Sequence, residues 1–216
     1  MAIRISKTSK LDGVKSWSLQ ARKTCPGSFD VAGDLVAACA GCYAVGGNYR
    51  FRNVVEPREE NQIDWKRDEW VSDMISALRN ERYFRWFDSG DMYDARLAKK
   101  IYLVMLNTPD VKHWLPTRMY KFAKFKAILA AMQALPNVMV RPSSDSVTGD
   151  FEAGLHGSTI VPDTVPRQGV KLCHAATNEG KCGPCRDCYS KDIPVIGYLA
   201  HGRSMAKVLR ELEAAR

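Results

Sequence analysis

Apolar residues along the chain follow two different spacings, and these spacings predict helices and strands in alternation. At four places apolar residues recur every three or four positions, as they do on one face of a helix. This spacing predicts helices over residues 64–78, 97–105, 122–132 and 205–212. Short apolar runs that end at turn residues predict strands. The strands are expected at residues 17–21, 83–87, 113–115, 138–140, 158–161 and 195–199.

The alternation of strand and helix predicts parallel strand pairing with right-handed crossovers. About six such units fit into the 216 residues, whereas a closed barrel of eight units typically needs about 250 residues. We therefore expect an α/β fold of the partial (β/α)6 TIM-like barrel type, with cysteine-rich loops that bind clusters. An open, doubly wound sheet is the alternative.

The chain is expected to form one domain over residues 1–216, divided into three segments. Residues 22–53 hold a first cysteine loop, residues 54–166 form the β/α core, and residues 167–216 carry a second cysteine group with the last strand and helix. In either architecture, the loops that follow the strands form the functional face. The polar and turn-forming residues found at these strand ends are Asp88, Ser89, Gly90, Asp91, Arg118, Arg141 and Ser143.

The charge and the composition limit the classes of protein to which this chain can belong. A net charge of +8 and a pI near 9.2, with basic residues spread along the chain, permit weak, salt-sensitive attraction to nucleic acid. No stretch approaches the roughly 20 apolar residues of a membrane span, and the first residues lack the apolar block of a signal peptide. We therefore expect a cytoplasmic protein with no membrane partner; the sequence predicts no particular oligomeric state.

The seven cysteines gather in two groups, which are separated by a long stretch without any cysteine. The first group comprises Cys25, Cys39 and Cys42, and the second comprises Cys173, Cys182, Cys185 and Cys188. An odd number of clustered thiols in a reducing compartment argues against structural disulfides. We therefore interpret all seven as ligands of metal ions or of iron–sulfur clusters.

The second group has the spacing Cys-x8-Cys-x2-Cys-x2-Cys. Three cysteines at successive spacings of three let one tight loop wrap a compact object, and Cys173 supplies the fourth thiol. This arrangement is close to the run that binds a cubane [4Fe–4S] cluster in bacterial ferredoxins. Zinc is the alternative, although zinc usually takes two separate Cys-x2-Cys pairs.

The three thiolates of the first group leave one iron of a cubane without a cysteine. Such an iron can bind a substrate or a cofactor, and its loss converts the cluster to [3Fe–4S]. The alternatives are a zinc ion completed by His or Asp, and a cluster completed by a distant thiol. We expect two [4Fe–4S] clusters, one for each group.

A three-cysteine loop after the first strand of a β/α chain resembles the radical S-adenosylmethionine superfamily. In that superfamily three cysteines hold a [4Fe–4S] cluster whose open iron binds the methionine part of the cofactor. The resemblance implies S-adenosylmethionine as a small-molecule cofactor, with residues 87–91 at its amino group and Arg118, Arg141 and Ser143 at its carboxylate and ribose. The first cysteine gap here holds thirteen residues, where that superfamily commonly has three.

The whole chain also resembles the phage and plasmid family known as gene product 88. The matching stretches are residues 25–26, 39–44, 85–91 and 180–185. The resemblance implies an iron–sulfur protein of radical-enzyme-like architecture, located in the host-cell cytoplasm if it is phage-encoded. The function expected is cluster binding, with a radical enzyme of unidentified substrate and catalytic residues as one hypothesis. The alternative is a module stabilised by zinc or a cluster that binds nucleic acid or another partner without catalysis.

Overall fold

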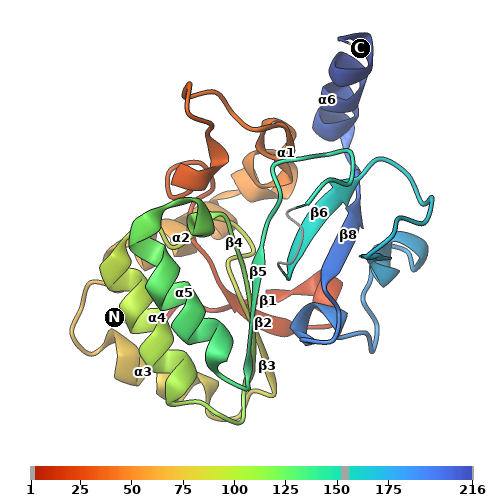
Figure 1. Cartoon of the computed structure of the whole chain (residues 1–216). Coiled ribbons are helices and arrows are strands. Elements are labelled where there is room, and N and C mark those ends of the chain that lie inside the picture. The colour runs from red at the N-terminus through yellow and green to blue at the C-terminus, as the bar shows by residue number, and fades with distance from the viewer. Residues whose placement is uncertain (1–2, 152–155, 216) are drawn as a thin grey trace.

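Eight strands form two separate sheets in the computed structural model, which describes residues 3–151 and 156–215 (Figure 1). The first sheet has the strand order β1–β2–β3–β4–β5. Its strands are β1 (Ser6–Thr8), β2 (Val14–Trp17), β3 (Tyr83–Trp86), β4 (Lys112–Thr117) and β5 (Val138–Pro142). β1 pairs antiparallel with β2, whereas the pairs from β2 to β5 are parallel. The first two strands form a hairpin, in which Gly13 with φ of +82° lets the chain reverse.

The second sheet is smaller and begins beyond the β5 edge of the first (Figure 1). Its strands are β6 (Gly157–Val161), β7 (Val170–Leu172) and β8 (Val195–Leu199). They are parallel and lie in the order β6–β8–β7. An isolated parallel bridge between Ser143 and Ser158 joins the two sheets just after β5. Regular pairing is interrupted at this bridge, so the described strands form no closed barrel.

Helices from the crossover connections cover one face of the first sheet (Figure 1). The α-helices of the described residues are α1 (Ala37–Ala40), α2 (Arg52–Asp64), α3 (Trp70–Leu78), α4 (Ala95–Leu106), α5 (Ala123–Ala134) and α6 (Arg203–Ala214). α3, α4 and α5 lie against this face. α4 begins at Asp94, whose carboxylate accepts a hydrogen bond from the backbone N–H of Arg96 at 2.8 Å and so caps the helix.

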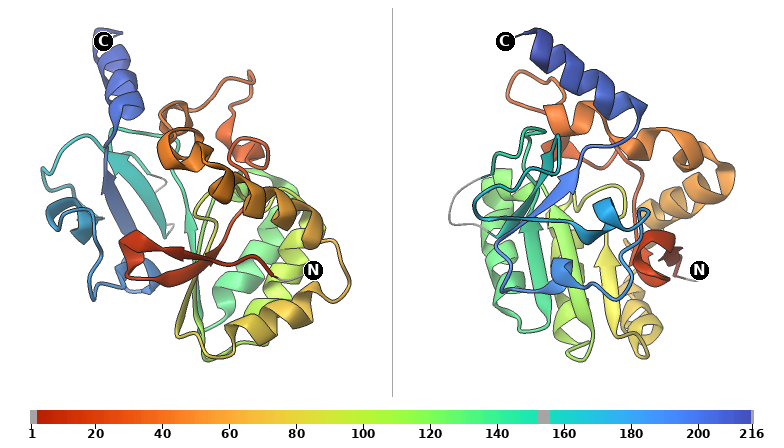
Figure 2. Two further views of the ribbon diagram at one scale, coloured as in Figure 1. Left: turned by 180° about the vertical axis from the view of Figure 1, so that it is seen from behind. Right: turned by 90° about the vertical axis from the view of Figure 1, so that its right-hand side faces the viewer.

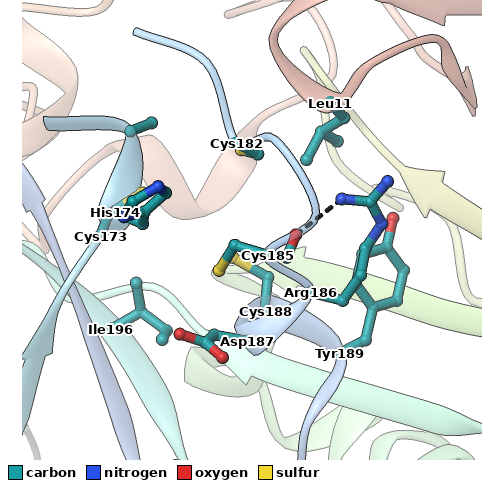
Figure 3. A pocket seen from close by; sticks show the side chains of 11 residues that line it. Leu11, Cys173, His174, Cys182, Cys185, Arg186, Asp187, Cys188, Tyr189 and Ile196 are labelled. Atoms are coloured by element: carbon teal, nitrogen blue, oxygen red, sulfur yellow. Dashed lines mark hydrogen bonds between the residues drawn. The ribbon is translucent and has the colours of Figure 1, made fainter. Parts of the chain in front are cut away.

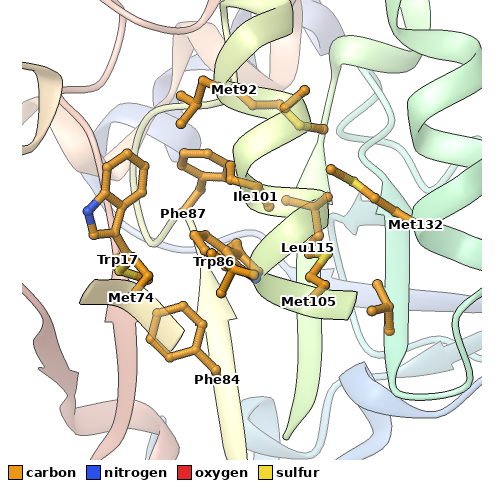
Figure 4. Packing of buried hydrophobic residues seen from close by; sticks show 14 of the residues in the cluster. Trp17, Met74, Phe84, Trp86, Phe87, Met92, Ile101, Met105, Leu115 and Met132 are labelled. Atoms are coloured by element: carbon orange, nitrogen blue, oxygen red, sulfur yellow. The ribbon is translucent and has the colours of Figure 1, made fainter. Parts of the chain in front are cut away.

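An aromatic core fills the space between these helices and the sheet (Figure 4). Trp17 of β2 and Trp70 of α3 meet edge to face with ring centroids 5.3 Å apart, and Trp17 meets Trp86 of β3 at 6.1 Å. All three side chains are fully buried. Each such pair contributes about 0.5–1.5 kcal/mol beyond the burial of its area. The core therefore fixes the carboxyl ends of β2 and β3. These ends lead into the loops that carry Cys25 and residues 88–91.

His113 of β4 is buried in the same core. The indole N–H of Trp86 donates to its Nδ1 at 3.3 Å, and its Nε2 lies 2.9 Å from the hydroxyl of Thr108. Burial lowers the pKa of His113 to about 3, so the ring is neutral at physiological pH.

The C-terminal part of the chain lies over the opposite face of the first sheet (Figure 2). Side chains alternate along β4, so that Leu115 lies in the aromatic core and Trp114 points the other way. Trp114 packs with Leu11 and Cys182, and its ring lies 5.9 Å from that of Tyr189. The segment that carries the second cysteine group therefore packs directly on the sheet.

The expected partial (β/α)6 TIM-like barrel is wrong. Parallel pairing with helical crossovers is present from β2 to β5, but it ends there. In a barrel, a helix follows each strand and packs on the outside. Between β6 and β8 the described chain contains no α-helix and instead forms the loops of the second cysteine group. The sheet therefore lacks the units that would continue it, and the radical S-adenosylmethionine-like fold is not supported.

Helix predictions succeeded where an apolar stripe exists. The helices expected at residues 97–105, 122–132 and 205–212 are confirmed as α4, α5 and α6, with ends that differ by one or two residues. The helix expected at 64–78 begins only at Trp70. α2 was not predicted, because it contains Pro57 and the residues that it buries are Arg58, Asn61 and Asp64. None of the described helices has both the length and the apolar character needed to cross a membrane.

Candidate metal centres

The first cysteine group lies in the loop at the carboxyl end of β2. Cys25 begins a short 3-10 turn, Cys39 lies in α1, and Cys42 follows that helix. α1 packs against α6 (Figure 2), and Gly41 makes this possible because a Cβ there would stand 2.7 Å from Cε of Met205. The last helix of the chain therefore holds two of the three cysteines in place.

The turn after β3 is tied to the segment that leads to Cys25. The N–H of Leu19 donates to the carbonyl of Ser89 at 3.0 Å, and the N–H of Asp91 donates to the carbonyl of Thr24 at 3.0 Å. Gly90 has φ of +78°, and a Cβ there would stand 2.6 Å from that of Leu19. The residues expected at this strand end, 88–91, therefore lie beside the first cysteine loop.

Asp88 and Ser89 of this turn are engaged with other protein groups. The carboxylate of Asp88 accepts from Arg85 at 2.9 Å and from the hydroxyl of Tyr49 at 2.6 Å. The hydroxyl of Ser89 accepts from Nε of Arg58 at 2.6 Å. These contacts fix both the turn and the loop that carries Tyr49.

Asp91 is a buried carboxylate between the first cysteine loop and the end of β4. Its Oδ1 accepts from the hydroxyl of Thr117 at 2.7 Å and from the N–H of Met92 at 2.8 Å, and its Oδ2 accepts from the N–H of Arg118 at 2.8 Å. Burial raises the pKa of Asp91 to about 6, and these donors act in the opposite direction.

Burial opposes ionisation of Cys25 and Cys42 in the metal-free protein. Burial, followed by the negative charge of Asp91, raises the pKa of Cys25 to about 12. Burial also raises the pKa of Cys42, although the N–H of Ala44 and the charge of Arg22 act against it. Metal binding at this group must displace protons and therefore depends on pH.

Arg118 and Asp145 close the first site on the side of β4 and β5. Nε of Arg118 donates to Asp145 at 3.1 Å, and Lys121 pairs with the same carboxylate. The carbonyl of Asp145 accepts from the N–H of Ala38 in α1 at 3.0 Å. Gly27 lets Arg118 approach, because a Cβ at Gly27 would stand 2.5 Å from that of Arg118. The predicted residue Arg118 is thus part of the first site.

The second cysteine group lines one hollow, shown in Figure 3, with an empty volume of about 340 Å³ that includes its open mouth. Its wall contains all four thiols of the group, those of Cys173, Cys182, Cys185 and Cys188. The N–H of Cys173 donates to the carbonyl of Gly197 at 2.8 Å, and that of Cys182 donates to the carbonyl of Lys10 at 2.8 Å. Sγ of Cys188 lies 3.2 Å from the hydroxyl of Tyr198. Contacts with both sheets therefore place the four cysteines around this hollow.

Arg141, at the end of β5, is a fully buried cation beneath the second group. Its guanidinium donates at 2.8–3.4 Å to six backbone carbonyls, those of Gly157, Asp187, Cys188, Ser190, Ile193 and Pro194. Burial lowers the pKa of Arg141. The structure thus places this predicted residue as a support of the second cysteine loop. Ser143, also predicted, lies at the junction of the two sheets.

Burial also opposes ionisation of three cysteines in the second group. Burial raises the pKa of Cys188 to about 11, and the hydrogen bond with Tyr198 acts in the opposite direction. Burial raises the pKa of Cys182 and Cys185 as well. Metal binding by these three thiols must therefore displace protons.

Arg85 of β3 lies between the two groups and was missed by the sequence analysis. Its guanidinium donates to Asp88 at 2.9 Å and stands 4.7 Å from the ring centre of Trp114. Its charge acts on Tyr43 in the first loop and on Cys188 in the second group. A charged residue inside the apolar strand 83–87 was the available signal, because it marks the face turned away from the core.

Within residues 3–151 and 156–215, no three His, Cys, Asp or Glu side chains converge closely enough to hold one metal ion. A tetrahedral zinc site with Zn–S bonds of about 2.3 Å would bring its sulfurs to about 3.8 Å from one another. Neither cysteine group is arranged in this way.

A match to a protein family covers most of the chain. The family model described as "Gene product 88" matches residues 3–196, a range that contains all seven cysteines. No curated protein matches the chain. No solved structure matches it either.

Proposed function

The chain belongs to the gene product 88 family, and we propose that it is an iron–sulfur protein that binds one cluster at each of its two cysteine groups. The second group offers four thiols for a [4Fe–4S] cluster, and the first group offers three. Bound clusters would supply one-electron chemistry. The chain's own residues bind and orient the clusters and set the charge around them.

The observation that carries this proposal is the convergence of four thiols on one hollow. In a zinc site all four sulfurs bind the same ion and therefore stand close together. In a cubane each thiolate binds a different iron, so the sulfurs lie farther apart. The described cysteines share the wall of this hollow, and their Cys-x2-Cys-x2-Cys spacing favours a cluster over zinc.

Buried positive charge supports the same interpretation. The hydrogen bonds of Arg141 in the described residues all go to neutral carbonyls, although its side chain is fully buried. The charge of Arg85 also reaches Cys188. The charge of Asp187 acts on Arg141 from the same loop. Thiolates bound to a cluster would add further negative charge around this buried cation.

The walls of the hollow are suited to a cluster that must be kept from water. Leu11, Ala175 and Ile196 line it together with the ring of Tyr189, and Trp114 packs behind Leu11. An apolar shell around a metal centre limits solvent access and tunes its redox potential.

The proposal is tested by purifying the full chain without oxygen and measuring bound iron and acid-labile sulfide. We expect about eight iron atoms per chain, four for each site, and broad visible absorption that bleaches with dithionite. Cys185→Ser should remove the second cluster and Cys39→Ser the first, so each should lower the iron by about half. Ser190→Ala, in the same loop as Cys188, is the matched control and should keep all the iron.

A colourless protein that carries stoichiometric zinc would contradict the proposal. Unchanged iron in both cysteine variants would contradict it equally, because the iron would then be bound elsewhere.

S-adenosylmethionine cleavage and nucleic-acid binding stay predictions from the sequence. The first is checked by adding S-adenosylmethionine to the reduced protein and assaying 5′-deoxyadenosine. The second is checked by measuring the salt dependence of binding to duplex and single-stranded DNA.

A further inference from the structure

We propose that the carboxylate of Asp91 is the fourth protein ligand of the cluster at the first site. It binds the iron that the three cysteines leave without a thiolate. The inference rests on the proposed function, because it presupposes a cluster at this site. It assigns to Asp91 a bond between Oδ2 and iron rather than a contact with an outside molecule.

Backbone contacts fix Asp91 beside Cys25. The N–H of Asp91 donates to the carbonyl of Thr24, the residue before Cys25, at 3.0 Å. On its other side, the N–H of Arg118 donates to Asp91 at 2.8 Å. The Cβ of Arg118 lies so near Gly27 that a Cβ there would stand only 2.5 Å away. Asp91 is therefore enclosed between the segment that carries Cys25 and the end of β4.

The hydrogen bonds of Asp91 leave one position open on one oxygen. Oδ1 accepts from Thr117 and from Met92, which uses both of its lone pairs. Oδ2 accepts only from the N–H of Arg118 among the described residues, so one lone pair remains. Carboxylates that bind metals are oriented in this way by neighbouring donors.

The surroundings of Asp91 favour a further positive partner. Asp91 is 6% exposed, and its three hydrogen-bond donors are neutral groups. The charge of Arg118 acts on Asp91, but the guanidinium of Arg118 pairs directly with Asp145. A buried carboxylate whose donors are all neutral is costly. An iron at Oδ2 adds a positive charge in direct contact, and carboxylate oxygen is an accepted ligand of iron.

The test compares variants of the full chain prepared without oxygen. Asp91→Cys should keep both clusters and change the electron paramagnetic resonance signal and potential of one of them. Asp91→Ala should leave an iron without a protein ligand. Ferricyanide then takes one electron from the [4Fe–4S]²⁺ cluster, and the resulting 3+ cluster releases Fe²⁺ and becomes [3Fe–4S]⁺. The wild type and the control Asp163→Asn, which changes an aspartate paired with Arg167 away from the first site, should keep that iron under the same treatment.

The measurements are iron per chain and the resonance signal of the oxidised [3Fe–4S]⁺ form. In Asp91→Ala the iron should fall by about one atom per chain as this signal grows. Thr117→Val separates ligation from a structural role, because it removes a donor to Asp91 and keeps the carboxylate. We expect Thr117→Val to retain the iron; equal iron loss in Thr117→Val and Asp91→Ala would overturn the inference.

The inference is also overturned if Asp91→Cys and Asp91→Ala behave like the wild type while Cys39→Ser abolishes the first cluster. Failure of the proposed function looks different. In that case Cys39→Ser leaves the iron content and the resonance signals unchanged, because no cluster is bound at the first site.

Discussion

The two cysteine groups lie on the same sheet, but a different buried charged residue lies beside each of them. The first group lies at the carboxyl ends of the strands and shares its site with a buried carboxylate, Asp91. The second lies on the face of the sheet and rests on a buried cation, Arg141. The first group has three thiols and the second has four. A site with four thiols suits a cluster that keeps its ligands, whereas a site with an oxygen ligand suits one that can exchange a ligand.

This contrast predicts that each site can be lost without the other. The first site depends on the packing of α1 against α6, whereas the second depends on the loop that Arg141 holds.

Arg141→Met should have the largest effect and should fall on the second site. It removes a donor from six buried carbonyls. Those of Asp187 and Pro194 keep a backbone donor, and each carbonyl left without a donor costs about 1–3 kcal/mol. We expect a loss on the order of 5 kcal/mol in urea unfolding and loss of about half of the iron. Lys191→Met is the control, because Lys191 also binds carbonyls, those of Gln133 and Leu135, away from the thiols. Equal loss of iron from both sites would contradict the prediction that one site can be lost without the other.

Gly41→Ala should weaken the first site alone. Its Cβ would stand 2.7 Å from Cε and 2.9 Å from Cα of Met205, so α1 must shift against α6. Overpacking of this kind costs about 3 kcal/mol at most. The expected result is a first cluster that is lost more readily to a chelator, with the second unchanged. Gly46→Ala, where nothing lies within 4 Å, should behave as the wild type.

Acid should destabilise the whole fold through His113, irrespective of either site. The folded pKa of about 3 lies below the unfolded value near 6.5, so the unfolded chain binds the proton first. The contribution of the neutral His113 ring to the free energy of unfolding is fully present above pH 6.5. It falls as the pH drops, by about 2 kcal/mol at pH 5. Urea unfolding of the metal-free protein should show this loss, and His113→Gln should lack it. Identical pH profiles would contradict the assignment of a buried neutral ring.

Arg85→Met should have the smallest effect and should reach the second cluster. Removing a positive charge that acts on Cys188 disfavours the more negative, reduced cluster. We expect its potential to fall by about 60 mV or less, which is a tenfold change for one electron. Arg82→Met removes an arginine just before the same strand and is the control. An equal shift in both variants would show that the effect depends on net charge and not on the position of Arg85.

The sequence predicted the parts of the molecule that depend on local patterns. Apolar stripes gave α4, α5 and α6, and the cysteine spacing singled out the groups that the structure places in two separate sites. Residues 88–91 and Arg118 were expected at one edge because the carboxyl ends of parallel strands meet there, and the structure brings them together beside Cys25.

The parts that depend on contacts between distant segments could not be predicted. The sheet stops after β5, because no described helix lies between that strand and the next strand, β6, and β6 belongs to the second sheet. No apolar periodicity in the sequence indicates this. Arg141 at a strand end gives no sign that six carbonyls surround it. α2 buries polar side chains, so it lacks the stripe that marks the other helices.

Anomalous diffraction at the iron absorption edge, from crystals of the full chain grown without oxygen, tests the central claim most directly. The account predicts one multi-iron peak among Cys173, Cys182, Cys185 and Cys188 and a second among Cys25, Cys39, Cys42 and Asp91. A zinc peak at either group, or iron at neither, would contradict it.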